Sequence, residues 1–323
     1  MKPIIALVYG GYSSEAAISK KSASTLFNNI NTELFHPILV EISQQHWAAI
    51  IDEQTYSIDK NNFTYTKDGN TIKFNAAFIT IHGTPGEDGK LQSYFDMIKL
   101  PYVNSDSFSS ALSFNKWACN KLLSTYQIPV AKSILLRKGD EVNTQKIVSE
   151  LKLPCFVKPN DGGSSFGISK VKTEQDLHPA ITKAFNEGNE VIIESFVEGR
   201  EFTCGVYKSN DKLTALPPTE IISNNDFFDY EAKYKGESNE VTPAKISKEE
   251  TEQMQALAMQ IYQIIGLKGV ARVDCLMQNN GTIYPIEVNT TPGMTEESII
   301  PQQIAASGKK LIDVLTLLIE EAL

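Results

Sequence analysis

Two alternating stretches near the C-terminus constrain the fold more than any other part of the chain. Residues 271–277 read ARVDCLM and residues 283–289 read IYPIEVN. Alternation of apolar and polar residues is typical of a β-strand with one buried face. Between them, Asn280 and Gly281 form the strongest short signal for a two-residue hairpin turn. The sequence therefore predicts a β-hairpin over residues 271–289.

The predicted turn fixes which residues face each other. It places Asp274 opposite Glu287 and Arg272 opposite Asn289, and all four side chains then project from one face. The other face is expected to be buried in the core. Its members are Val273, Cys275, Ile286 and Val288.

The polar face of the hairpin has the composition of a metal site. Asp274 and Glu287 would repel each other across the strands, so a cation is expected between them. Together with Asn289 they offer only oxygen ligands, which suit Mg²⁺ shared with phosphate. Arg272 adds a fixed positive charge for an oxyanion. From spacing alone, the alternative is an edge hairpin with a solvated polar face.

The residues after the hairpin favour the metal interpretation. Residues 290–295 read TTPGMT, in which Pro292-Gly293 ends the strand and Gly293 lets a backbone N–H approach a ligand. Arg-x-Asp followed by Glu-x-Asn-Thr-x-Pro-Gly-Met-Thr resembles the metal-binding strands of the ATP-grasp superfamily. More narrowly, it resembles the D-alanine–D-alanine ligase family, and further motifs follow in family order along nearly the whole chain.

The resemblance implies a reaction. It is the ATP-dependent joining of two D-alanines into D-alanyl-D-alanine through a D-alanyl phosphate intermediate, for peptidoglycan precursor synthesis. Two Mg²⁺ ions, with Mn²⁺ as an alternative, would bind Asp274, Glu287 and Asn289. Arg272 and the Gly293 N–H would hold the tetrahedral oxyanion, and Ser298 and Ile299 would meet the second D-alanine. The family also implies a homodimer.

Composition excludes several other classes of protein. The chain has 323 residues, 41% of them hydrophobic and 21% charged, which is typical of soluble proteins with two or three substructures. A net charge of −9 argues against nucleic acid and anionic membrane as partners. No apolar run reaches the roughly 18 residues of a membrane helix. Four scattered cysteines indicate free thiols, so we expect a cytoplasmic protein.

The N-terminal part predicts an α/β fold. A buried strand at 4–9, a glycine-rich turn and a helix at 15–28 are similar to the start of a doubly wound parallel sheet, with further strands near 35–41 and 76–81. The absent Gly-x-Gly-x-x-Gly fingerprint excludes a dehydrogenase. The resemblance implies an N-terminal α/β domain at 1–113 and a two-part ATP-grasp fold, with α+β central (114–203) and C-terminal (204–323) subdomains.

Two candidate substrate residues follow strands of this first segment. Ligands of open α/β sheets gather at the carboxyl ends of strands, where Glu15 and His82 lie. A plain structural turn and a structural histidine are the alternatives. Residues 82–89 read HGTPGEDG, which is similar to a family motif. The resemblance implies that Glu15 meets the first D-alanine's ammonium and that His82 lies beside the same substrate. The family often has charged residues after this Glu, whereas here Ala16 and Ala17 follow.

A glycine-rich loop is the candidate phosphate cover. Residues 160–167 read NDGGSSFG and offer backbone N–H groups and hydroxyls to phosphate; a disordered surface loop is the alternative. Lys158 ends an apolar strand, where a buried lysine needs an anion. The resemblance implies that Lys116 and Lys158 bind the phosphates of ATP. It also implies that Ser164 positions the substrate.

Residues 191–201 resemble the family's adenine-binding linker. Glu194 would read the adenine amino group, the backbone near Val197 would follow its edge, and Glu201 would bind the ribose hydroxyls. Without the resemblance these are ordinary acids at strand ends. The implied ATP-binding set is Lys116, Lys158, Ser165, Glu194, Ser195, Phe196, Val197, Glu201 and Lys233.

Residues 227–234, FFDYEAKY, are similar to the family's covering loop. Lys233 would touch the γ-phosphate, and Tyr234 would hydrogen-bond towards Ser164 and Glu15. Relatives that join D-alanine to D-lactate tend to have Phe or His at this position, so Tyr234 favours the dipeptide ligase. A regulator built on a decayed ligase would have lost a key lysine, arginine or metal ligand, and none is missing.

Overall fold

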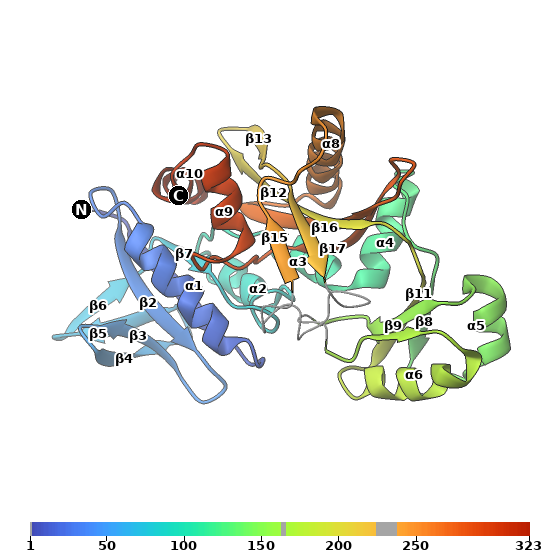
Figure 1. The fold of residues 1–323 in the computed structure, drawn as a ribbon. Helices are drawn as coiled ribbons and strands as arrows, with labels where there is room; N and C mark the ends of the chain where they lie inside the picture. The colour runs from blue at the N-terminus through green and yellow to red at the C-terminus, as the bar shows by residue number, and fades with distance from the viewer. Residues whose placement is uncertain (1, 163–165, 224–237) are drawn as a thin grey trace.

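The computed structural model describes residues 2–162, 166–223 and 238–323, which form three β-sheets with flanking helices (Figure 1). The first sheet has the order β6-β5-β4-β3-β2-β1-β7. Its strands are β1 (Ile4–Gly10), β2 (His36–Ile42), β3 (Trp47–Ile51), β4 (Gln54–Asp59), β5 (Thr64–Lys67), β6 (Asn70–Lys73) and β7 (Ala76–Ile79). The accompanying helices are α1 (Ala16–Asn29), α2 (Lys90–Met97) and α3 (Ser107–Phe114).

The first sheet is mixed, so the prediction of a doubly wound parallel sheet is wrong in part. Strand β1 runs parallel to β2 and β7, as expected. Strands β3 to β6 instead form an antiparallel meander. The cause is local, because Asp52 and Glu53 both have positive φ angles and join β3 to β4 in a two-residue turn. Such a turn can connect only antiparallel strands. Asp68-Gly69 does the same between β5 and β6.

The second sheet is antiparallel and has the order β10-β9-β11-β8. Its strands are β8 (Ser133–Arg137), β9 (Cys155–Pro159), β10 (Ser169–Val171) and β11 (Glu190–Ser195). Helices α5 (Thr144–Leu151) and α6 (Leu177–Phe185), with the short 3₁₀ helix η1 (Glu174–Asp176), pack on it. Its core is its own, because the cluster of buried residues there runs only from Leu136 to Ile193.

The third sheet has the order β15-β14-β12-β16-β17, with β13 paired to β12. Its strands are β12 (Arg200–Ser209), β13 (Lys212–Ala215), β14 (Thr219–Ser223), β15 (Ser238–Val241), β16 (Val270–Met277) and β17 (Ile283–Asn289). Helices α4 (Lys116–Thr125), α8 (Lys248–Ile265), α9 (Ile299–Ala306) and α10 (Leu311–Ala322) complete the chain. The sheet lies between the other two (Figure 1).

Helix α8 illustrates how local sequence sets these bounds. Ser247 accepts a hydrogen bond from the Glu250 N–H while the Glu250 carboxylate accepts one from the Ser247 N–H, a capping box. The helix ends at Gly266, whose φ of +75° suits glycine. Its buried side, which includes Met254 and Ile261, packs against β12 and β16. The helical period of its apolar residues, among them Met254, Leu257 and Ile261, predicts a helix over residues 248–265, and the structure confirms this range.

The predicted hairpin is present, but its turn differs from the prediction. The Gln278 N–H donates to the Thr282 carbonyl and the Gly281 N–H donates to the Gln278 carbonyl, so the loop has three residues rather than two. A register shift after Asp274 follows, with Cys275 opposite Pro285. The shift compensates for the extra loop residue.

The compensation restores the predicted pairs of the polar face. Asp274 lies opposite Glu287 and Arg272 opposite Asn289, as predicted. The expected burial is wrong at Ile286, which the bulge turns away from the core and into a cavity. Pro285 takes its place on the buried side.

Helix α9 is fastened to β12 by one side chain. Gln303 is fully buried, accepts a hydrogen bond from the Gly205 N–H at 2.9 Å, and donates to the Thr203 carbonyl at 2.9 Å and the Thr219 hydroxyl at 3.0 Å. A Cβ at Gly205 would lie 2.5 Å from Ile300, so the close approach requires glycine.

Across the described ranges, no helix is long and apolar enough to cross a membrane.

Gly281 provides a test of the three-residue turn. Its φ is +83° and a Cβ there would meet nothing within 4 Å. We expect Gly281→Ala to lower the free energy of unfolding by about 1 kcal/mol through backbone strain alone. Gly281→Asn should cost less, because asparagine tolerates this conformation. Urea denaturation of both variants would measure this, and equal losses would contradict the turn geometry.

Candidate functional site

A cavity of about 470 Å³ lies between the second and third sheets. Strands β9 and β11 line it from one side, and β12, β14, β16 and β17 from the other. Apolar side chains and charged groups of both signs share its wall. Predicted site residues among them are Lys116, Lys158, Glu194, Ser195, Phe196, Val197, Glu201, Arg272, Asp274, Glu287 and Ile299.

The polar face of the hairpin is a dense network around Asp274. Arg272 donates from Nε and Nη2 to the two Asp274 oxygens, each at 2.8 Å, in a bidentate pair. Asn289 Nδ2 donates to the same carboxylate at 2.9 Å, and the Thr203 hydroxyl donates at 2.5 Å. Burial opposes the charge of Arg272, but contact with Asp274 outweighs it and raises the pKa of Arg272. The guanidinium is therefore a permanent cation.

The donor chemistry of this face fits a divalent metal. Asp274 and Glu287 supply carboxylate oxygens, and Asn289 supplies an amide that presents its oxygen after rotation about its last bond. Within the ranges that the structure describes, no group of three or more His, Cys, Asp and Glu side chains gathers as a metal site. Any metal here would thus be held by two carboxylates and an amide.

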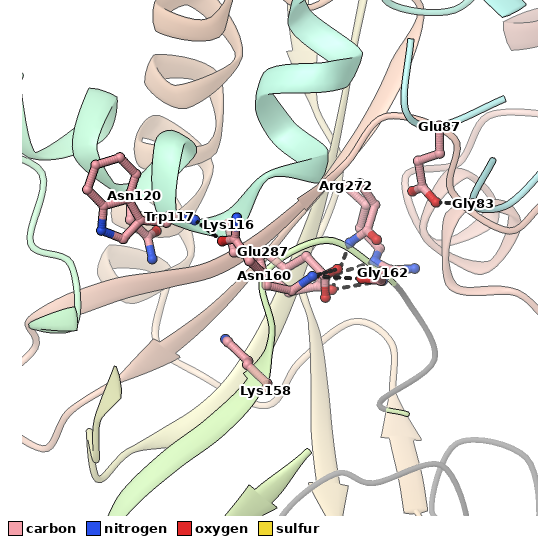
Figure 2. Close-up of polar contacts among 12 residues, drawn as sticks. Gly83, Glu87, Lys116, Trp117, Asn120, Lys158, Asn160, Gly162, Arg272 and Glu287 are labelled. Atoms are coloured by element: carbon pink, nitrogen blue, oxygen red, sulfur yellow. Dashed lines mark hydrogen bonds and ion pairs between the residues drawn. The ribbon is translucent and has the colours of Figure 1, made fainter. Parts of the chain in front are cut away.

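Lys116 balances the second carboxylate. Its Nζ lies 3.4 Å from Glu287 Oε1 and donates to the Gly162 carbonyl at 2.7 Å, and the side chain is only 8% exposed (Figure 2). It is the first residue of α4, whose N-cap is Asn115. Lys116 therefore connects the hairpin to Gly162 in the glycine-rich loop.

Lys158 and Glu194 form a buried ion pair at the other end of the cavity. Their Nζ and Oε2 atoms are 2.7 Å apart, and the exposed fractions of the side chains are 7% and 10%. Lys158 on β9 is opposite Ile192 on β11, and Glu194 lies two residues further along β11, so the two side chains are diagonal neighbours on one face of the sheet. Asn120 Nδ2 donates to the other oxygen of Glu194 at 3.0 Å. A cation and an acceptor are thus fixed side by side.

Asn160 joins three elements behind this cavity. It is fully buried, its carbonyl accepts from the Lys116 N–H at 3.0 Å, and its Oδ1 accepts from the Trp117 N–H at 2.8 Å. Its Nδ2 donates to Glu190 at 2.8 Å. The first residue of the glycine-rich loop therefore fixes the start of α4 against β9 and β11 (Figure 2).

A second cluster lies where the first sheet meets the hairpin. Glu15 ends the turn after β1, and His82 follows β7. Burial lowers the pKa of His82; Glu15 opposes this effect and Arg272 adds to it. His82 Nε2 is buried and, within the described chain, has no hydrogen-bond partner. Burial also raises the pKa of Glu87 to about 7, although the Gly83 N–H donates to it at 2.9 Å.

Gly293 and Ser298 are brought together at the start of α9. A Cβ on Gly293 would lie 2.9 Å from Ser298 Oγ, so a larger residue here would displace the Ser298 hydroxyl. Ser298 is the N-cap of α9 and Ile299 its first residue. Because the first N–H groups of a helix lack intrahelical partners, this end favours a carboxylate.

The structure thus assembles most of the predicted residues around one cleft. The predicted Ser164, Ser165, Lys233 and Tyr234 lie outside the described residues. Sequence reasoning missed the contacts of Asn120 and Asn160 and the desolvation that raises the pKa of Glu87. The partners of Asn120 and Asn160 lie more than 25 residues away in the sequence, so no local pattern indicates these contacts. The desolvation of Glu87 has no local signal either, although its place in the motif at residues 82–89 could have singled it out.

Two family models match the chain. The model described as "D-ala D-ala ligase N-terminus" matches residues 4–105, and "D-ala D-ala ligase C-terminus" matches residues 122–320. Among curated proteins, a D-alanine–D-alanine ligase of Parabacteroides distasonis is 48% identical, covering 100% of this chain and 98% of the relative. One of Phocaeicola vulgatus is 46% identical, covering 99% of both chains.

Solved structures agree with these matches. The VanG D-Ala:D-Ser ligase from Enterococcus faecalis superposes with a TM-score of 0.91 at 33% identity, covering 100% of both chains. D-alanyl-alanine synthetase A from Vibrio cholerae gives a TM-score of 0.89 at 31% identity, covering 99% of this chain and 98% of that one.

The pKa of Glu87 predicts a pH-dependent stability. A carboxyl whose pKa is raised to about 7 on folding keeps its proton in the folded state at pH values where the unfolded state has lost it. The free energy of unfolding should therefore fall as pH rises from about 4.5 to 7, by up to about 3 kcal/mol. Glu87→Gln should remove this fall, whereas Glu33→Gln, at an exposed position, should not. Denaturation at a series of pH values, with a metal chelator present, would measure the free energy of unfolding. Parallel pH profiles of the wild type and Glu87→Gln would refute the role of Glu87 in this pH dependence.

Proposed function

The chain belongs to the D-alanine–D-alanine ligase family, and from this premise we propose how its cleft joins two D-alanines. The reaction consumes ATP and yields D-alanyl-D-alanine, ADP and phosphate, for the synthesis of peptidoglycan precursors. The observation that carries the proposal is one cavity lined both by the lysines Lys116 and Lys158 and by the carboxylates Asp274 and Glu287. Cations and carboxylates together suit a polyphosphate and its metal.

ATP would lie along this cavity. Lys116 and Lys158 bind its phosphates, with Lys233 and Ser165 as further contacts from residues outside the described ranges. Glu194 accepts from the adenine amino group, the Ser195–Val197 backbone follows the base, and Glu201 binds the ribose. The Lys158 Nζ and Glu194 Oε2 atoms lie 2.7 Å apart, and this supports the arrangement, because a cation and an acceptor are then available to the same bound nucleotide.

The first half-reaction makes a reactive acyl donor. A carboxylate is a poor electrophile, so the carboxylate oxygen of the first D-alanine attacks the γ-phosphorus of ATP, and ADP leaves. Glu15 binds the ammonium of this D-alanine, with His82 beside it and Ser164 and Tyr234 orienting it. Asp274, Glu287 and Asn289 would hold Mg²⁺ or Mn²⁺, and a bound divalent cation would neutralise charge on the transferred phosphoryl group.

The second half-reaction forms the peptide bond. The amine of the second D-alanine attacks the acyl carbon, and phosphate leaves. Arg272 and the Gly293 N–H stabilise the oxyanion that develops, and Ser298 and Ile299 at the start of α9 bind the second carboxylate. The Asp274 contact supports the role of Arg272, because it fixes the guanidinium as a cation at 2.8 Å from both carboxylate oxygens.

Exclusion of water completes the proposal. An acyl phosphate hydrolyses in water, so the glycine-rich loop and the Tyr234 segment would cover the cleft before phosphoryl transfer.

The domain limits at 113/114 and 203/204, the homodimer and the cytoplasmic location stay predictions.

Phosphate release tests the reaction directly. With ATP and Mg²⁺, we expect phosphate release with D-alanine and not with L-alanine, and mass spectrometry should identify the dipeptide. D-serine and D-lactate should be included as second substrates, because a D-Ala:D-Ser ligase is among the similar structures. Protein that binds ATP but releases no phosphate with D-alanine would exclude the ligase function.

Tyr234 provides a test of the choice of nucleophile. We expect Tyr234→Phe to raise D-lactate incorporation relative to D-alanine. The resemblance to the family implies that a phenol at this position favours the amine nucleophile. Tyr230→Phe in the same segment is the matched control. Mass spectrometric product ratios across pH measure the effect, and ratios equal to those of the wild type would contradict the assigned role.

A further inference from the structure

Asn120 is a buried polar residue for which the proposed reaction has no role. It lies on α4, one helical turn after Lys116, and is only 5% exposed. Its side-chain amide donates to Glu194 Oε1 at 3.0 Å. The two residues are 74 positions apart in the sequence, on a helix and on strand β11. This contact therefore connects α4 to the proposed adenine end of the cavity.

Both oxygens of Glu194 are engaged in this arrangement. Oε1 accepts from Asn120 and Oε2 contacts Lys158 Nζ at 2.7 Å. Donors at both oxygens restrict rotation of the carboxylate about its last bond. Each oxygen still has acceptor capacity for another donor. The carboxylate is thus held in one orientation while it remains able to accept from a ligand.

Asn120 acts from outside the cavity. Glu194 and Lys158 line the cavity wall, and Asn120 does not. Figure 2 shows Asn120 on α4 and Lys158 on the neighbouring strand. Asn120 would therefore affect a nucleotide only through Glu194.

We propose that Asn120 is a positioning residue that orients the Glu194 carboxylate and thereby sets the preference for adenine over a 6-oxopurine. The inference rests on the proposed function, in which Glu194 accepts from the adenine amino group. A fixed carboxylate receives that N–H donor, whereas the O6 acceptor of hypoxanthine faces a negative charge and is repelled. Rotation of the carboxylate away from O6 would remove the penalty, and the Asn120 hydrogen bond prevents it.

Two substitutions separate hydrogen bonding from shape. Asn120→Leu keeps the approximate volume and removes the donor. Asn120→Asp keeps the shape and places a carboxylate against Glu194. The matched control is Ser124→Ala, which alters an exposed residue one turn further along α4 that bonds only within the helix.

Calorimetric titration of the full-length protein with ATP and with inosine triphosphate measures the proposal without catalysis. We expect Asn120→Leu to weaken ATP binding about tenfold and to reduce the ATP preference by a similar factor. Asn120→Asp should weaken ATP binding further, because two carboxylates would be adjacent. At saturating ATP and D-alanine, kcat should stay within about twofold of the wild-type value. Ser124→Ala should match the wild type in each measurement.

The outcomes are distinguishable. If the wild type does not bind ATP, the proposed function itself fails. If it binds ATP and the Asn120→Leu and Asn120→Asp variants keep the wild-type ratio of ATP to inosine triphosphate affinity, Asn120 has only a structural role and the inference is wrong. Because a selectivity ratio compares two ligands on the same folded protein, a general loss of stability would not imitate the expected change. If Asn120→Leu does not fold, the ratio for Asn120→Asp decides.

Discussion

The balance of charge between two neighbouring strands governs how the cleft is built. Asp274 and Glu287 face each other across β16 and β17, where two unneutralised carboxylates would repel. Arg272 neutralises the first and Lys116 the second. Because Lys116 comes from a helix outside the third sheet, part of the charge balance of the hairpin depends on α4. The electrostatic requirement therefore couples the hairpin to the rest of the cleft.

Helix α4 carries this coupling to the second sheet. Its first turn is held by Asn160, which immediately follows β9. One turn later, Asn120 reaches Glu194 on β11. Lys116 and Asn120 are four residues apart, so they share a face of the helix. A single short helix thus sets the relative position of the groups proposed to bind the two ends of ATP.

Sequence reasoning was most accurate where the signal was local. The capped, periodic α8 was located at its observed limits, whereas the polar meander of β3 to β6 was missed because its strands are short and half-exposed. The pairing of Asp274 with Glu287 was right although the turn was not, since the bulge at Ile286 offset the extra loop residue. The partners of Asn160 and Asn120 could not be inferred, because tertiary packing alone brings those elements together. The family motifs located the site; they did not provide its hydrogen bonds.

The attachment of α9 has a mechanical consequence. The buried Gln303 side chain hydrogen-bonds to the backbone of β12. It does so at Gly205, where the missing Cβ permits the close approach. The helix that begins at Ser298 is thereby attached to β12, which pairs with β16, the strand that carries Asp274. A relative movement of the second sheet would leave this attachment intact, because every hydrogen bond that the described residues make to the Gln303 side chain lies within the third sheet and α9. The group proposed to bind the second substrate would then keep its place beside the carboxylates proposed to hold the metal.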